Sequence, residues 1–327
     1  MKYLLTSDLH IGNNKNNPIF LDISLNYAKW LKHTAKKHDI TEIIIAGDFF
    51  HDRNSVNLRA LDTGHKFLDC LSEFQIHIIT GNHDAWFLDN SDIHSLSPFK
   101  TRKNVHIYDE LTTVGGITYC PWGTTAEMIP DGSNVLIGHW NLVSFQMAKG
   151  KICDHGVKGT DLMEKCNMAF SGHFHKPQLR TYAGKPLRML GSAFQLNWGE
   201  SGETKFCYIL DSSNNTITEI ENTVSPRFEY IHTEDDLAKI KGNFITFQIV
   251  NDEAGNLVKD RYEALQPILS IPNFIEKTVV SLDKQMEEFQ LVQIEEATEE
   301  FLSATTYMDE VKNEIKKEFM KLHDSFS

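Results

Sequence analysis

Residues 1–10 read MKYLLTSDLH, and the fold prediction starts from this stretch. Residues 3–6 are mostly apolar and predict a buried strand. The motif Asp8-Leu9-His10 follows at once, so a carboxylate and an imidazole stand at the carboxyl end of that strand. In an open sheet with helices on its faces, loops at this end converge on a ligand. The stretch therefore predicts a strand that carries a polar motif to a binding edge.

Two further strands are predicted downstream, each separated from the one before by a helix. Residues 42–46 and 76–80 have the composition of buried strands. Residues 19–37 and 56–74 have helical periodicity. This βαβαβ order implies a sheet with helices on its faces.

After residue 105 the sequence is rich in short β-like runs. Turn signals at residues 183–186 and 213–215 predict two hairpins. The other strands expected here are residues 105–108, 112–114, 117–120, 135–137 and 168–170. We therefore predict an α/β (α+β) fold in which a two-sheet β-sandwich is flanked by helices.

The composition becomes charged around residues 233–241, and we place a domain boundary there. Residues 1–232 are expected to form the main domain. Residues 233–285 are expected to form a small β-α-β capping domain, with strands at 244–250 and 274–281 and a helix at 259–269. Residues 286–327 are expected to form an acidic linker and a C-terminal amphipathic helix.

Five short polar motifs each follow a predicted strand. Four of them begin with glycine, which suits a backbone that turns sharply and packs close to a metal. The motifs are Asp8-Leu9-His10, Gly47-Asp48-Phe49-Phe50-His51, Gly81-Asn82-His83-Asp84, Gly138-His139-Trp140 and Gly172-His173-Phe174-His175. Strand ends of one sheet edge lie together, so the motifs predict a single site.

The side chains of these motifs are suited to divalent metals. Carboxylate, imidazole and amide ligands fit manganese, iron, zinc or magnesium, and no thiolate takes part. One ion is expected on Asp8, His10 and His175, and a second on Asn82, His139 and His173, with Asp48 bridging the two. Two ions roughly 3.5–4 Å apart can clamp a phosphodiester and activate a water.

Three further residues of the motifs are expected to act on the substrate. His83 follows the amide ligand directly and is expected to meet the leaving oxygen as a protonated acid. Asp84 is expected to orient His83, and His51 to stabilise the transition state.

These motifs resemble the calcineurin-like metallophosphoesterase superfamily over residues 1 to about 210. Gly47-Asp48-Phe49-Phe50-His51 resembles its DNA-repair nuclease branch, the SbcD family and the phage recombination counterparts. Protein phosphatases of the superfamily would have Gly-Asp-x-x-Asp-Arg-Gly and Gly-Asn-His-Glu, whereas this chain has His51, Asn54 and Asp84. Gly138-His139-Trp140 and the short length are most similar to the phage members.

The resemblance implies a metallophosphoesterase sandwich that uses two Mn²⁺ ions, with Mg²⁺ as an alternative. It implies 3′-to-5′ exonuclease and single-strand endonuclease activity in double-strand-break repair and recombination. It also implies a homodimer and a coiled-coil ABC ATPase partner of the SbcC type. Five scattered cysteines without CxxC spacing fit a reducing cytoplasm, here that of a bacterial or phage-infected cell. No apolar run is long enough for a membrane span.

Two other functions stay open on the sequence alone. The same site could hydrolyse cyclic nucleotides or other small phosphodiesters, although His51 and the C-terminal module speak against this. A catalytically inactive scaffold is the third possibility, although every ligand position is filled.

Contacts with DNA are expected from a few side chains beside the motifs. The net charge of −13 predicts weak non-specific affinity for DNA. Candidates for phosphate contact are Lys15, Arg53, Asn54, Lys100, Arg102 and Lys103, with plain solvated loops as the alternative. Trp140 and Trp198 could stack on bases or pack in the core.

Two surfaces are candidates for protein partners. A homodimer is expected through residues 56–74 and 92–96, although the stripe of Leu61, Leu68 and Leu71 could instead face the sheet. In the tail, Met308, Val311, Ile315, Phe319 and Leu322 recur at spacings of three and four. Six glutamates between residues 287 and 300 resemble a tether, so we expect this helix to bind the ATPase rather than its own module.

Overall fold

The computed structural model describes residues 1–231, 242–248 and 275–277. Three predictions fall outside these ranges: the helix at 259–269, the acidic linker, and the five partner-binding residues of the tail. Among the described residues, no helix is both long and apolar enough to cross a membrane.

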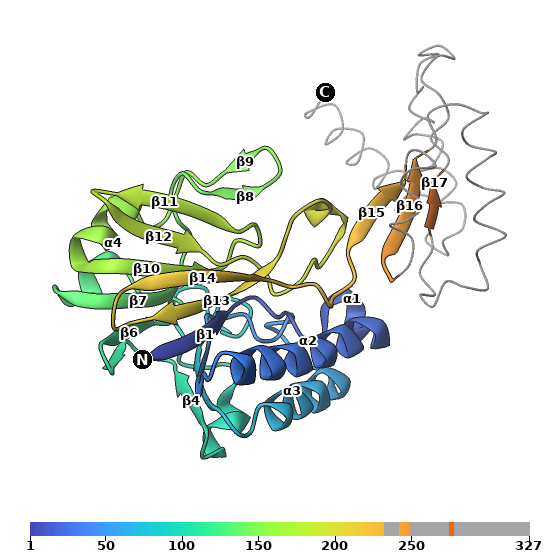
Figure 1. Cartoon of the computed structure of the whole chain (residues 1–327), viewed down its shortest axis with the longest axis horizontal. Helices are drawn as coiled ribbons and strands as arrows, with labels where there is room; N and C mark the ends of the chain where they lie inside the picture. The colour runs from blue at the N-terminus through green and yellow to red at the C-terminus, as the bar shows by residue number, and fades with distance from the viewer. Residues whose placement is uncertain (232–241, 249–274, 278–327) are drawn as a thin grey trace, which may run out of the picture.

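The first sheet of the sandwich contains the predicted N-terminal strands (Figure 1). In the described part of the chain it has six strands in the order β14-β13-β1-β2-β3-β4. Strands β1 to β4 run parallel, and β13 and β14 are antiparallel additions at one edge. The bounds are β1 Lys2–Thr6, β2 Glu42–Ile45, β3 Gln75–Ile79, β4 Val105–Tyr108, β13 Phe206–Asp211 and β14 Thr216–Glu221.

The second sheet comes from the strand-rich half of the sequence. Its six described strands have the order β11-β12-β10-β7-β6-β5, with the four central ones parallel. The bounds are β5 Thr112–Val114, β6 Ile117–Cys120, β7 Ser133–His139, β10 Cys166–Gly172, β11 Gln178–Tyr182 and β12 Lys185–Met189. Both predicted hairpins are confirmed, since β11 pairs with β12 and β13 with β14.

Two long helices cover the outer face of the first sheet (Figure 1). Helix α2 spans Pro18–Lys37, and the Asn17 side chain caps it by accepting from the backbone N–H of Ile19 at 3.0 Å. Helix α3 spans Leu58–Cys70, shorter than the predicted 56–74: Asn57 caps its start, and the helix ends before Leu71. The apolar faces of both helices pack against the sheet in one core cluster.

The leucine stripe of α3 belongs to this core. Leu68 and Leu71 are fully buried and Leu61 packs against them, so the stripe faces the sheet. This contradicts the use of the stripe as a dimer surface. Apolar side chains that do reach solvent nearby are Leu58, Trp86, Phe87, Leu88 and Ile93.

A second core joins the two sheets, and a third lies on the outer face of the second sheet. Tyr3, Tyr119 and Phe170 are among the residues buried between the sheets. Leu162 and Met163 of α4 (Gly159–Lys165) lie in the outer core. The prediction of a two-sheet sandwich flanked by helices is therefore confirmed, although α4 itself was not predicted.

Several short elements complete the described chain, and none of them was predicted. They are the left-handed turn α1 Asn13–Asn16, the 3₁₀ turns η1 Ser97–Thr101, η2 Ala126–Met128 and η3 Trp198–Glu200, and the ribbon of β8 Gln146–Ala148 with β9 Lys151–Ile152.

A small parallel sheet lies beyond the amino end of α2 (Figure 1). It contains β15 (Phe228–Ile231), β16 (Phe244–Gln248) and β17 (Ile275–Lys277). The Phe228 and Phe244 rings stack on Phe20 of α2, with centroids 6.4 and 5.2 Å from it. The domain boundary expected near residue 233 falls directly after β15. Strand β15 nevertheless pairs with β16, which lies on the other side of that boundary.

Candidate metal centre

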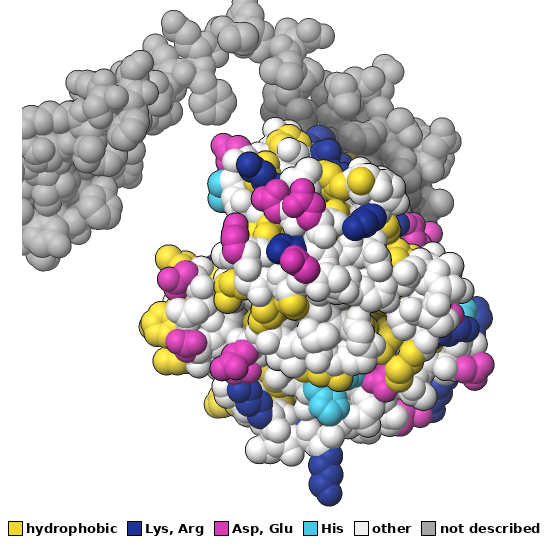
Figure 2. Space-filling model, turned by 90° about the vertical axis from the view of Figure 1, so that its left-hand side faces the viewer, with side chains coloured by type: hydrophobic (Ala, Val, Ile, Leu, Met, Phe, Trp, Pro, Cys, Tyr) yellow, Lys and Arg dark blue, Asp and Glu magenta, His cyan; other side chains and the backbone are white. Residues whose placement is uncertain are grey.

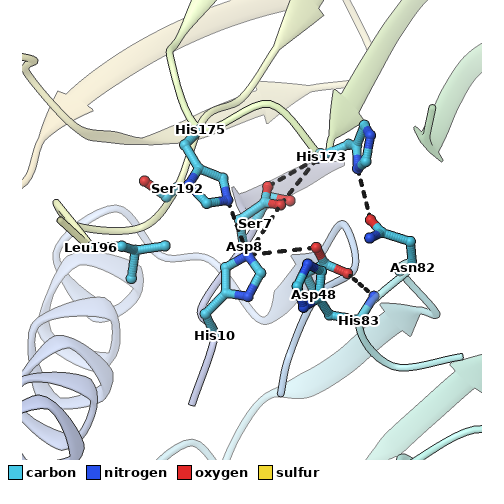
Figure 3. A network of polar contacts seen from close by, with 12 residues as sticks. Ser7, Asp8, His10, Asp48, Asn82, His83, His173, His175, Ser192 and Leu196 are labelled. Carbon is cyan, nitrogen blue, oxygen red and sulfur yellow. Dashed lines mark hydrogen bonds and ion pairs between the residues drawn. The ribbon is translucent and has the colours of Figure 1, made fainter. Parts of the chain in front are cut away.

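The five motifs meet at the carboxyl ends of parallel strands, as predicted from their positions. Three follow β1, β2 and β3 of the first sheet, and two stand at the ends of β7 and β10 of the second. In Figure 3 the side chains of the first, second, third and fifth motifs point toward one another; those labelled are Asp8, His10, Asp48, Asn82, His83, His173 and His175. Backbone hydrogen bonds join the loops, for example from the N–H of Asp8 to the carbonyl of Gly47 at 3.1 Å.

Asp8, His10 and His175 form one group of candidate ligands, with donor atoms within 4.8 Å of one another. The Nε2 atoms of His10 and His175 are 3.0 Å apart. Burial lowers the pKa of His10 well below its ordinary value, which keeps the imidazole neutral and able to bind a metal. This is the trio expected to hold the first ion.

Asp48, His139 and His173 form a second group within the same distance limit. The Oδ1 atom of Asn82 joins it, 3.0 Å from His139 Nε2 and 2.7 Å from His173 Nδ1. Burial lowers the pKa of His173 to about 3. This group contains the residues expected to hold the second ion.

The Asp48 carboxylate lies between the two groups. Its Oδ2 atom is 3.5 Å from His10 Nε2 and 3.3 Å from His139 Nε2. Burial alone would raise the pKa of Asp48, but His139 and the other imidazoles lower it below its ordinary value. In turn, although burial opposes it, Asp48 raises the pKa of His139 to about 9. The carboxylate is thus an anion that faces the ligands of both groups.

The donor set fits two divalent cations. Two carboxylates, four imidazoles and one amide oxygen converge from five loops, a ligand mixture typical of manganese, iron, zinc or magnesium sites. Such close approach of nitrogen and oxygen donors in a buried site is stabilised when cations lie between them.

Two glycines are required by this close packing. A Cβ atom on Gly81 would lie 2.2 Å from Oδ1 of Asp48, and one on Gly47 would lie 2.4 Å from Nδ1 of His139.

Asp8, His10 and Asp48 have φ values of 51°, 45° and 51°, a conformation that L-residues rarely adopt. Backbone strain of this kind is concentrated at functional sites.

Asp84 has a different role from the one predicted. Its carboxylate accepts hydrogen bonds from the backbone N–H groups of Phe49, Phe50 and Gly81, at 3.2, 3.0 and 3.0 Å. It therefore fastens the second motif to the third rather than orienting His83. The carbonyl oxygen of His51 takes that place, 2.5 Å from Nδ1 of His83.

His51 and His83 lie side by side next to the first group. Their rings are stacked with centroids 5.5 Å apart, and His83 also donates its backbone N–H to Asp48 at 2.8 Å. Together with His10 their donor atoms lie within 4.8 Å of one another. Because a carbonyl can only accept, Nδ1 of His83 carries the proton of that contact and Nε2 is left for other partners.

Sequence reasoning missed two residues that contact the second ring nitrogen of a candidate ligand. Oε1 of Glu200 lies 2.9 Å from Nδ1 of His175, and Oδ1 of Asn141 lies 2.8 Å from Nε2 of His173. Asn141 directly follows the fourth motif, which was a usable signal. Glu200 is 25 residues from its partner in the chain, and no local pattern marks it.

Three of the six residues expected to contact DNA pair with other groups of the chain instead. Arg53 donates to the backbone carbonyl of Asn82 and so supports that ligand. Lys100 pairs with Asp109 at 2.5 Å, and Arg102 with Asp69 at 2.7 Å. Lys15, Asn54 and Lys103 are exposed.

The two tryptophans considered for base stacking pack against the protein. Trp140 is 2% exposed. The ring of Trp198 lies 5.0 Å from that of Phe228. Core packing, the alternative left open, is therefore what the structure shows.

Comparison with known proteins gives a family match and weaker partial similarities. A family model described as the calcineurin-like phosphoesterase superfamily domain matches residues 1–214. SbcD of the nuclease SbcCD from Escherichia coli K12 is 34% identical over 94 residues, 26% of this chain and 22% of that protein. The protein from Escherichia coli O157:H7 matches equally. The matched region is thus less than a quarter of the length of these relatives.

Solved structures with similar folds have low sequence identity to this chain. An archaeal phosphodiesterase is similar over 68% of this chain and 100% of its own, at 14% identity and a TM-score of 0.35. Pseudomonas putida nuclease MPE is similar over 67% and 87%, at 16% identity and a TM-score of 0.33. At these values the similarity says nothing about the reaction.

Proposed function

The chain belongs to the calcineurin-like phosphoesterase superfamily, and we propose that it is a manganese-dependent nuclease that cuts phosphodiester bonds in DNA. The observation that carries a two-ion reaction is the position of Asp48, whose Oδ2 atom faces His10 and His139 from between the two ligand groups. When bound, two divalent ions would polarise a phosphodiester and lower the pKa of an attacking water.

The residues around the ions would complete the reaction. His83 is held by the His51 carbonyl, with its ring centroid 4.7 Å from that of His10. From there it would donate a proton to the leaving oxygen. His51, stacked on His83, would stabilise the charge that develops on the phosphate.

DNA is the proposed substrate for two reasons. The second motif ends in His51, as in the nuclease branch of the superfamily, and the partial relative from Escherichia coli belongs to a nuclease. We propose 3′-to-5′ exonuclease and single-strand endonuclease activity in recombination or repair.

Phosphate contacts outside the metal centre would be few. On the face shown in Figure 2, lysines and arginines are scattered among acidic side chains rather than gathered in one patch. A cavity of about 450 Å³ is lined by Lys176 and Pro177, which follow His175, and by Lys149 from the turn between β8 and β9. Glu203 also lines it, but Lys205 pairs with that carboxylate at 2.8 Å. We propose that Lys149 and Lys176, which line this cavity, contact a DNA backbone entering beside His175.

We further propose a coiled-coil ATPase of the SbcC type as partner, because the partial relative is a component of SbcCD. The apolar residues of the tail from Met308 to Leu322 are the proposed contact. Hydrolysis of cyclic nucleotides or other small phosphodiesters is the second candidate function, since the metal centre would act equally on a small ester.

One experiment separates these functions. The purified chain is incubated with Mn²⁺ and end-labelled single-stranded or duplex DNA, and in parallel with a chromogenic phosphodiester. Degradation of DNA together with the ester supports the nuclease. Turnover of the ester alone supports the small-ester hydrolase, and turnover of neither supports a scaffold.

A further inference from the structure

Trp122 stands beside the metal centre at a position that the motifs do not mark. It is the second residue after β6 and is half-buried. Its backbone N–H donates to the carbonyl of Thr80 at 2.9 Å, and its carbonyl accepts from the hydroxyl of Ser91 at 3.1 Å. The first bond ties Trp122 to Thr80, between β3 and the third motif, and the second ties it to the loop that follows this motif.

The Trp122 ring contacts two candidate ligands of the second group. Its centroid is 5.3 Å from the His173 ring and 6.1 Å from the His139 ring. Its indole N–H donates to the carbonyl of Leu88 at 2.8 Å, so the polar atom of the ring is already satisfied. What the ring can still offer to a ligand is its aromatic surface.

The loop of residues 86–92 lies beside Trp122 and carries two further exposed aromatic residues. Trp86 and Phe87 are 51% and 38% exposed. The loop is packed on Gly123, where an added Cβ atom would lie 2.3 Å from the carbonyl oxygen of Asp89. The backbone of Leu88 and Asp89 is therefore held against residues 122–123.

The charge of this loop indicates which part of a nucleic acid it suits. Residues 86–92 include Asp89 and Asp92 and no basic side chain. Such a loop repels phosphates, whereas every nucleobase has a π face that stacks on an aromatic ring. A base, and not the sugar-phosphate backbone, is the matching ligand.

We propose that Trp122 is the stacking platform for an unpaired nucleobase next to the phosphate held at the metal centre. This inference rests on the proposed DNA nuclease function and adds a binding site for single-stranded or frayed ends. Duplex DNA would need to unpair at its end before the base reaches the ring.

The test compares Trp122→Leu and Trp122→Phe with Trp30→Leu and Trp30→Phe, since Trp30 is a partly buried tryptophan on α2. With single-stranded oligothymidylate and Mn²⁺, Trp122→Leu should raise KM about 5- to 100-fold, the usual strength of one stacked base. The kcat value should stay within about threefold, and Trp122→Phe should retain most of the affinity. The Trp30 variants should match the wild type.

Two readouts do not depend on turnover. With a chelator present to prevent turnover, oligothymidylate should quench the tryptophan fluorescence of the wild type and of Trp30→Phe. It should quench the fluorescence of Trp122→Phe much less. Bound manganese should be the same in all variants. An unchanged KM with undiminished quenching would overturn the stacking site while DNA cleavage by the wild type still supports the nuclease. Loss of manganese in Trp122→Leu would also overturn it, because the ring would then merely cover His173. A wild type that cuts no DNA would refute the nuclease itself.

Discussion

Oε1 of Glu200 lies 2.9 Å from Nδ1 of His175, whose other ring nitrogen faces the first ligand group. The second oxygen of Glu200 accepts from Ser192, from the N–H of Leu196 and from Lys205. Burial would raise the pKa of Glu200, but the hydrogen bond from His175 and the charge of Lys205 lower it to about 2. A carboxylate fixed in this way sets the tautomer and direction of a metal-binding histidine.

Glu200→Gln should therefore weaken Mn²⁺ binding about 10- to 100-fold, the usual effect of removing such a support. Isothermal titration with Mn²⁺ measures this directly. Glu203→Ala is the matched control, because Glu203 also pairs with Lys205 but makes no contact with His175 among the described residues. Equal Mn²⁺ affinity in the wild type and Glu200→Gln would show that Glu200 only supports the loop.

Asp48→Ala should abolish hydrolysis and reduce bound manganese from two ions to one or none, because both groups lose the carboxylate they share. Mn²⁺ should raise the Tm of the wild type, since a ligand that binds only the folded state stabilises it. The variant should show little of this rise. Full Mn²⁺-dependent cleavage by Asp48→Ala would disprove the bridging role.

His83→Asn should lower kcat about 10²- to 10⁴-fold, the usual contribution of a general acid, while both manganese ions remain bound. The same substitution at His51 should act in the same direction. Metal content by mass spectrometry is the deciding measurement, because His10, His51 and His83 could themselves hold an ion. If His83→Asn loses manganese, His83 is a ligand and not an acid.

A homodimer is expected through the exposed apolar side chains near the start of α3 and after the third motif. Leu58 and Ile93 are 81% and 59% exposed. Light scattering should give twice the 37.4 kDa of one chain, and Leu58→Glu with Ile93→Glu should give a monomer. Met128→Glu, at a residue 57% exposed on η2, serves as control. A wild-type monomer at micromolar concentration would contradict the dimer.

Deleting residues 300–327 should leave Mn²⁺-dependent cleavage by the isolated chain nearly unchanged while removing co-purification with an SbcC-type ATPase. The reason is that the tail follows a glutamate-rich stretch resembling a tether, and its apolar seam needs a partner surface. An insoluble or inactive truncated chain would mean that the tail completes the core of its own chain.

Local signals in the sequence were enough to predict the sandwich and most of the side chains that meet at the candidate metal centre. Residues 3–6, 42–46 and 76–80 carry strand signals, and each motif stands directly behind its strand. The carboxyl ends of parallel strands lie at one edge of the sheet. The positions of the motifs were therefore enough to predict that Asp8, Asp48 and Asn82 lie close together. The short elements α4, β8 and β9 were missed because a few residues hold too little periodicity to identify them.

The side chains that support or surround that centre became known only from the packed structure. Asp84 binds the backbone of the second motif, Glu200 reaches His175, and Trp122 lies against His173. Likewise, only the structure shows that the leucine stripe of α3 faces the sheet and that Arg102 pairs with Asp69. A motif identifies the side chains that follow a strand. The contacts of Asp84, Glu200 and Trp122, in contrast, join residues far apart in the chain. Their geometry exists only once the two sheets have packed.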